Sequence, residues 1–212
     1  MLNYRIIPVT PFEQNCCLLW DDETGHAVLT DPGGDLERVF AIVAREGVEL
    51  QAVWLTHAHI DHAGAAAPAA RRAGVPIMGP HPDDKFWIDM LPQQAQMFGF
   101  SQAEPFTPDR WLHDGDTLTL GSLRFDVRHC PGHTPGHVVF HQPQAQRCWV
   151  GDVLFAGSIG RTDFPRGNQK QLIDSIVQKL WPMGDDTVFI PGHGPESTFG
   201  DERRHNPYVG GT

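Results

Sequence analysis

The strongest constraint on the fold lies in residues 56–62, which have the sequence THAHIDH. Residues 51–55 before them are apolar enough for a buried strand, and the Ala-rich residues 63–67 after them favour a helix. One strand-to-helix loop therefore carries four potential metal ligands, which are His57, His59, Asp61 and His62. The alternative is a surface loop that happens to be rich in histidine, and the ligands that follow downstream disfavour it.

The spacing within this loop suits two neighbouring metal ions. In an extended segment, residues two apart point the same way, so His57 and His59 can hold one ion together. Asp61 and His62 lie further along and can hold a second ion nearby. Imidazole binds zinc and iron well, and a mixed set of imidazole and carboxylate is typical of a catalytic metal site rather than a sealed structural one.

Three further segments place a metal-binding residue directly after a predicted strand. They are residues 130–137 (CPGHTPGH), 150–152 (VGD) and 190–194 (IPGHG), and their candidate ligands are His133, Asp152 and His193. Gly and Pro in such turns hold a side chain rigidly at the strand end, as a metal site requires. Together with the first loop these segments supply five His and two Asp, enough for two ions.

Length and charge limit the possible functions. The 212 residues are enough for one domain with a sizeable core, so we predict a single domain over residues 1–212. The formal charge is −10, from 16 Lys and Arg against 26 Asp and Glu. Nucleic-acid binding is disfavoured, because phosphate contacts need clustered basic residues and this chain has no basic run.

The cysteines and the N-terminal residues indicate a cytoplasmic protein. Four Cys are present, Cys16 and Cys17 are adjacent, and there is no CxxC pair, so we expect buried free thiols rather than disulfides or a thiolate zinc site. Residues 1–10 do not resemble a signal peptide, and no apolar run is long enough to span a bilayer.

The hydrophobic pattern predicts an α/β fold. Strands are expected over residues 3–9, 14–20, 26–30, 75–78, 116–120, 123–130, 138–141, 148–150 and 187–190. Helices are expected from residue 36, with Asp35 as N-cap and Gly47 as the stop, and over residues 63–73, 81–98 and 171–180, with a break at Pro92 and a loop at 101–110. This order indicates two sheets packed face to face with helices outside.

The ligand set resembles that of the metallo-β-lactamase superfamily, which implies a four-layer αβ/βα sandwich with a dinuclear site at one edge. The resemblance implies that one metal is held by His57, His59 and His133. The other metal would be held by Asp61, His62 and His193, with Asp152 bridging the two. It also implies that Asp31 supports the metal loop by hydrogen bonds, although Asp31 before Pro32 could equally be a simple turn former.

A closer resemblance covers nearly the whole chain. Residues 130–137, 160–167 (GRTDFPRG), 191–195 (PGHGP) and 106–111 (FTPDRW) resemble the short bacterial type II glyoxalase-like hydrolases. The resemblance implies a metal-dependent hydrolase acting on S-lactoylglutathione or a related hydroxyacyl-glutathione thioester, with two divalent ions. Zinc is expected, with iron and manganese as alternatives, because a His/carboxylate set accepts all three.

The expected chemistry is attack of a metal-bridging hydroxide on the thioester carbonyl. Asp61 is expected to orient the hydroxide and take its proton. Arg161 aligns with a basic residue that contacts the glutathione carboxylate in the family, although it could instead pair with Asp163 on the surface. His137 is expected to be structural, and Phe86, Trp87 and Phe98 to lie in the core or in a lid.

Several rival functions remain. A related family, the persulfide dioxygenases, shares the GRTDF run and would use His57, His133 and Asp152 to hold a single iron. A lactonase and a nuclease are weaker alternatives, and a non-catalytic metal-binding module is disfavoured by the intact ligand set. Antibiotic hydrolysis is disfavoured, because the best-known β-lactamase subclass carries a Cys at the position of Asp152.

Overall fold

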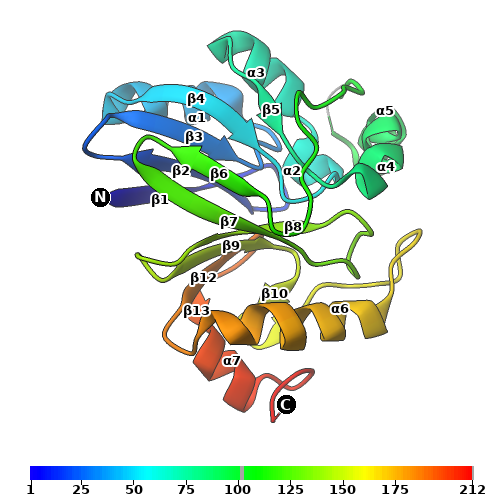
Figure 1. Cartoon of the computed structure of the whole chain (residues 1–212). Helices are drawn as coiled ribbons and strands as arrows, with labels where there is room; N and C mark the ends of the chain where they lie inside the picture. The colour runs from blue at the N-terminus through cyan, green and yellow to red at the C-terminus, as the bar shows by residue number, and fades with distance from the viewer. Residues whose placement is uncertain (101–102, 212) are drawn as a thin grey trace.

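Two β-sheets lie face to face through the middle of the molecule, and helices cover the outer side of each (Figure 1). The structure is a computed structural model that describes residues 1–100 and 103–211. The first sheet has the order β1 (Leu2–Val9), β2 (Gln14–Asp21), β3 (His26–Thr30), β4 (Glu49–Trp54) and β5 (Ile77–Met78). The second has the order β13 (Ser197–Thr198), β12 (Val188–Pro191), β9 (Arg147–Gly151), β8 (Val138–Gln142), β7 (Leu123–His129) and β6 (Thr117–Leu120). The predicted αβ/βα sandwich is confirmed.

The sequences of the strands explain this layering, because several strands have apolar side chains on both faces. Along β2, Cys17 and Leu19 belong to the core between the sheets, where Trp54 and Phe125 meet edge to face at 5.1 Å. The alternate residue Leu18 packs on the outer side, in the core formed with α1 (Leu36–Glu46). A strand covered on both faces has a nearly continuous apolar run, as β2 does.

Helices cover the outer faces as expected. In Figure 1, α1 and α3 (Ala66–Ala73) lie over the first sheet, while α6 (Gln169–Ser175) and α7 (Phe199–His205) lie over the second. The predicted helix over 63–73 is divided into α2 (Ile60–Ala63) and α3. Pro68 falls in the first turn of α3, where its missing N–H is tolerated.

The segment 81–98 breaks at a different residue from the predicted one. It contains a 3-10 turn at Pro82–Asp84, then α4 (Lys85–Asp89) and α5 (Leu91–Phe98). The break lies at Met90 rather than at Pro92, because Pro92 is in the first turn of α5 and favours a helix start. Residues 101–102 of the predicted loop lie outside the described residues.

Asp35 is the N-cap residue of α1, as predicted, but its side chain makes no capping hydrogen bond. Its backbone is left-handed, with φ 51°, and its carboxylate accepts a hydrogen bond from Thr10 N at 2.8 Å instead of capping the helix. Asp35 therefore fastens the β1–β2 turn to α1. Gly47 ends the helix with φ 67°, as predicted.

Short elements near the C-terminus were not predicted. The strand predicted at 187–190 is β12, and it is followed by β13 and α7 rather than being the last strand. The hairpin of β10 (Leu154–Phe155) and β11 (Ser158–Ile159) was also missed. Two-residue strands show no hydrophobic alternation, so periodicity cannot detect them. The single domain over 1–212 stays a prediction.

The cysteines and the helix lengths bear on two further expectations. All four Cys are buried and free, as predicted. None of the helices among residues 1–100 and 103–211 has the length and apolar character that crossing a membrane requires.

Candidate metal centre

The predicted ligand loop lies between β4 and α2, as its sequence indicated. His57 is fully buried, and His59 lies at the N-cap position of α2. Asp61 and His62 belong to the single turn of α2 itself, so they are on helix rather than on extended chain. Gly33 is pressed against this turn: a Cβ there would lie 1.5 Å from the carbonyl oxygen of Asp61. This contact requires glycine and fixes the start of α2.

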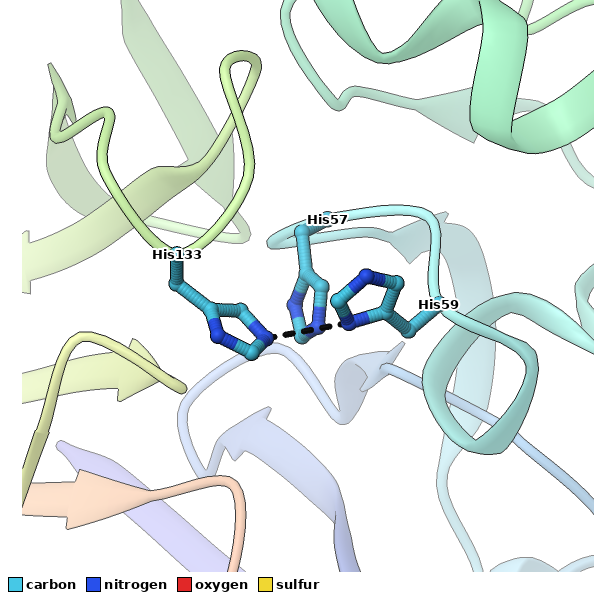
Figure 2. Close-up of side chains that lie close together, drawn as sticks. All are labelled: His57, His59 and His133. Atoms are coloured by element: carbon cyan, nitrogen blue, oxygen red, sulfur yellow. Dashed lines mark hydrogen bonds between the residues drawn. The ribbon is translucent and has the colours of Figure 1, made fainter. Parts of the chain in front are cut away.

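One group of candidate ligands consists of His57, His59 and His133 (Figure 2). One nitrogen of each ring lies within 4.8 Å of the others. His59 Nδ1 is 3.0 Å from His133 Nε2. His133 Nδ1 donates to the carbonyl oxygen of Arg161 at 2.7 Å, so a neutral His133 presents a lone pair on Nε2. His57 Nε2 is buried without a hydrogen-bond partner among the described residues.

The second group consists of Asp61, His62 and His193. Asp61 Oδ2 is 3.0 Å from His193 Nε2 and 3.8 Å from His62 Nε2. His193 Nδ1 donates to the carbonyl oxygen of Phe12 at 3.1 Å, which leaves Nε2 directed at the group. His62 Nε2 is buried and makes no hydrogen bond within the described part of the chain.

Asp152, which follows β9, lies between the two groups. Its Oδ2 is 3.5 Å from His133 Nε2 and 3.8 Å from His193 Nε2, and its Oδ1 is 3.3 Å from His62 Nε2. Its Oδ1 would lie 2.1 Å from a Cβ at Gly192, so the glycine of the PGHG turn makes room for the carboxylate. Asp152 is therefore a predicted ligand whose carboxylate lies within 4 Å of ring nitrogens from both groups.

The first group has the protonation state that metal binding needs. Burial, followed by the neighbouring histidines, lowers the pKa of His57 and His59 well below the usual value. Burial also lowers the pKa of His133. Neutral imidazoles are the form that ligates metals.

The second group favours a positive charge. Burial alone would lower the pKa of His62, but the Asp152 and Asp61 carboxylates raise it well above the usual value. For Asp152, burial acts in the opposite direction and would raise the pKa, but His62 and then His133 lower it. This half of the site thus attracts a cation, which a divalent metal would supply. The donor types and the unpartnered buried nitrogens fit two such ions, and the individual ligand assignments remain predictions.

Asp31 lies directly behind these ligands. Its carboxylate accepts hydrogen bonds from Thr56 N at 2.7 Å and Thr56 Oγ1 at 2.6 Å, and it lies 3.0 Å from His62 Nδ1. Asp31 also has a left-handed backbone, with φ 48°, so the turn-forming and supporting interpretations both apply. Its carboxylate is placed to hold the His62 ring with Nε2 toward the site.

Replacement Asp31→Ala is expected to weaken metal binding about 10–100-fold, because loss of a ligand's hydrogen-bond partner typically has this effect. Competition with a chromophoric chelator measures it. Asp31→Asn can keep the acceptor for Thr56 N and place an amide nitrogen at the Oδ2 position, so it tests whether the contacts of Oδ2 with His62 and the Thr56 hydroxyl are responsible. Unchanged metal affinity in Asp31→Ala would remove the supporting role.

Asp84 is a buried residue that the sequence reasoning missed. Its carboxylate accepts hydrogen bonds from Gly136 N at 2.6 Å, Thr134 Oγ1 at 2.9 Å and Ala58 N at 3.1 Å. Burial raises its pKa to about 7, against the lowering effect of these three donors. One side chain therefore joins the loop of residues 57–59 to the loop of residues 133–137. No sequence signal separates it from its exposed neighbour Asp83.

His137 is structural in position, as expected. Its Nε2 accepts a hydrogen bond from Asp152 N at 3.1 Å, and its ring stacks on His57 at 4.6 Å. His137 thus orients the backbone of Asp152 and one face of His57. It belongs to no candidate ligand group among the described residues.

A cavity of about 750 Å³ opens above the ligands. Asp61, Asp152 and His193 form part of its floor. Trp87 is buried in its wall, as predicted, whereas Phe98 is 39% exposed at the wall and is not a core residue. Other lining residues come from the β1–β2 turn, the break between α4 and α5, α5, β11 and the loop after β11, and are Phe12, Met90, Met97, Ser158, Ile159, Arg161 and Phe164.

Arg161 lines this cavity and is also paired. Its Nε and one terminal nitrogen donate to the Asp163 carboxylate at 2.7 and 2.6 Å, and its guanidinium lies 4.3 Å from the ring centre of Phe164. Both interpretations from the sequence therefore remain, because the side chain is 62% exposed and faces the cavity while paired.

Comparison with known proteins shows which family the chain resembles. The model of the family described as metallo-beta-lactamase superfamily matches residues 9–193. The curated protein hydroxyacylglutathione hydrolase GloC of Haemophilus influenzae is 47% identical over 209 residues, which cover 98% of both chains.

Two solved structures are similar over almost their whole length. The B3 metallo-beta-lactamase BLEG-1 is 35% identical, with a TM-score of 0.91 over 99% of this chain and 100% of that one. A di-iron-bound form of TTHA1623 is 36% identical, with a TM-score of 0.88 over 97% of this chain and 100% of that one.

Proposed function

Since the chain belongs to the metallo-beta-lactamase superfamily, we propose that it is a metal-dependent thioester hydrolase acting on S-lactoylglutathione or a related hydroxyacyl-glutathione. The observation that carries the proposal is the position of Asp152 within reach of both ligand groups, at the floor of the substrate-sized cavity. The similarity to hydroxyacylglutathione hydrolase GloC over 98% of both chains supports the choice of substrate.

We propose that His57, His59 and His133 hold one divalent ion, that Asp61, His62 and His193 hold another, and that Asp152 contacts both. Zinc is the expected metal, and the di-iron form of TTHA1623 makes iron the first alternative. When bound, such ions lower the pKa of water to roughly 7 and polarise a carbonyl oxygen.

Asp61 is the proposed proton acceptor. It lines the cavity, and its Oδ2 is 3.0 Å from His193 Nε2. One carboxylate oxygen can thus remain fixed beside His193 while the other orients a water toward the substrate carbonyl and holds its proton. No general acid is needed for the leaving group, because a thiol of pKa about 8.5 leaves readily as thiolate.

Arg161 is the proposed contact for a carboxylate of the thiol half of the substrate. We expect Arg161→Ala to raise KM about 5–20-fold with little change in kcat, because a lost charge-assisted hydrogen bond of about 1.5 kcal/mol weakens binding before the chemical step. Steady-state kinetics on S-lactoylglutathione measure both constants. Arg124→Ala, an exposed cation paired with Asp126, is the control. An unchanged KM in Arg161→Ala would leave only its pairing with Asp163.

Two other activities have a specific observation in their favour. A persulfide dioxygenase would need only His57, His133 and Asp152, and these residues are close together in the first half of the site. The similarity to the B3 metallo-beta-lactamase BLEG-1 favours β-lactam hydrolysis. This similarity weakens the earlier argument that β-lactam hydrolysis needs a Cys at position 152.

One experiment separates these activities. Purified protein of known metal content is given S-lactoylglutathione, glutathione persulfide with an oxygen electrode, and a chromogenic cephalosporin. The proposal predicts rapid loss of thioester absorbance and slow or absent reaction with the other two. Oxygen uptake on the persulfide with one iron per chain would replace it with the dioxygenase, and faster cephalosporin cleavage with the β-lactamase.

A further inference from the structure

Exposed apolar side chains are concentrated at the mouth of the cavity. Among the described residues, the exposed large hydrophobic side chains are Met1, Phe12, Met90, Met97, Phe98 and Tyr208. Four of these six, all except Met1 and Tyr208, line the cavity above the candidate ligands. Apolar surface gathered in one place rather than scattered marks a binding site for an apolar group.

We call the side chains of Phe12, Met97 and Phe98 the apolar wall of the cavity, and aromatic contacts hold part of it in place. Phe12, from the β1–β2 turn, meets Phe98 of α5 edge to face at 6.1 Å and Phe100 at 5.3 Å. Met97 lies beside them on α5 and is 74% exposed. Rigid aromatic rings and one flexible thioether can enclose chains of different length.

The apolar wall and Arg161 lie beside different ligand groups. The carbonyl oxygen of Phe12 accepts from His193, a member of the second group. The carbonyl oxygen of Arg161 accepts from His133, a member of the first group. Arg161 is the only Lys or Arg among the described residues that line the cavity, so a positively charged side chain is present at one end of the cavity only.

A thioester also has two different ends on either side of its reacting carbon. Its charged thiol half matches the wall that carries Arg161, because a guanidinium binds carboxylates. The acyl half then extends past the ligands toward Phe12, Met97 and Phe98, where a chain of methylenes would lose contact with water. A short hydroxylated acyl group such as lactoyl would leave most of this wall uncovered.

We propose that Phe12, Met97 and Phe98 form an acyl-chain subsite, and that the enzyme prefers thioesters with an apolar acyl chain of several carbons. This inference rests on the proposed thioester hydrolysis. It assigns the specificity of that site to the wall beside His193, and it predicts that affinity rises with acyl length.

Binding of S-alkylglutathiones tests the subsite without any turnover, because a thioether has no carbonyl to hydrolyse. Dissociation constants for the methyl, propyl, butyl and hexyl compounds can be followed by tryptophan fluorescence, since Trp87 lines the cavity. We expect affinity to rise about two- to four-fold per added methylene in the unmodified protein. Phe98→Ser and Met97→Ser should flatten this dependence, and both side chains are exposed enough for the variants to fold.

Tyr208→Ser is the matched control, because Tyr208 is an exposed aromatic residue that does not line the cavity. It should keep the full dependence on chain length. Equal affinities for methyl and hexyl compounds in the unmodified protein would overturn the subsite, as would a dependence that persists in both Phe98→Ser and Met97→Ser.

Kinetics on S-lactoylglutathione and S-hexanoylglutathione complete the test. The subsite predicts a kcat/KM for the hexanoyl compound at least about ten-fold above that for the lactoyl compound, since several methylenes become buried. Hydrolysis of both at equal kcat/KM would overturn the acyl preference and leave the proposed function intact. Binding that follows chain length with no hydrolysis of either compound would overturn the proposed function and support the apolar subsite.

Discussion

Asp152→Ala is expected to lower the rate of thioester hydrolysis by more than about 100-fold and to reduce the bound metal to less than about one ion per chain. Loss of a residue behind a ligand already weakens metal binding about 10–100-fold, and Asp152 contacts both ligand groups directly. Removing it also takes away the carboxylate that raises the pKa of His62 most strongly, and for His193 it leaves the Asp61 hydrogen bond as the main cause of the raised pKa.

Metal analysis by mass spectrometry and initial rates on S-lactoylglutathione measure this result. Asp152→Asn keeps the shape of the side chain without its charge, so it should also lose metal if charge is the cause. Asp174→Ala serves as the control, because Asp174 pairs with Lys170 on the solvent-exposed side of α6. Full metal content and an unchanged rate in Asp152→Ala would contradict the bridging position.

Asp84→Ala is expected to lower the free energy of unfolding by about 3–5 kcal/mol. The change leaves two backbone N–H groups, of Gly136 and Ala58, and the Thr134 hydroxyl without their acceptor, and each such group costs about 1–3 kcal/mol when buried. For a chain of this size the melting temperature should fall by roughly 10 °C. The two loops that carry His57, His59 and His133 would lose their common anchor.

A second measurement separates this local effect from general instability. At a temperature where Asp84→Ala is fully folded, we expect it to bind metal about 10–100-fold more weakly, because the loops are no longer held together. Asp83→Ala, a change at the exposed neighbour, is the matched control and should alter neither property. A folded Asp84→Ala protein with normal metal affinity would show that Asp84 stabilises the fold without organising the ligands.

The candidate ligands could be predicted from sequence because each of their four segments follows a strand, and three of these segments are short turns with Gly or Pro. His133 and His193 illustrate this, since both lie in PGH turns directly after β7 and β12. Their meeting point could not be derived from spacing, because it depends on how two sheets pack. The resemblance to a known family, rather than the residue spacing, indicated which of these ligands lie together.

Other features depend on packing alone. Asp83 and Asp84 are adjacent and chemically identical, yet only Asp84 is buried, because the 3-10 turn directs it between two loops. Phe98 was expected in the core or a lid, and its exposure at the cavity follows from the way α5 crosses the β1–β2 turn at Phe12. The hydrophobic pattern predicts that Phe98 makes apolar contacts, but it cannot distinguish contacts with the protein core from contacts with a substrate.

The most direct test of the dinuclear site is a metal titration of the apoprotein, followed by the rate of S-lactoylglutathione loss. Because Asp152 lies within reach of both ligand groups, we expect the rate to reach its plateau at about two divalent ions per chain. A plateau at one iron per chain with oxygen uptake on glutathione persulfide, or no thioester loss at any metal content, would contradict it.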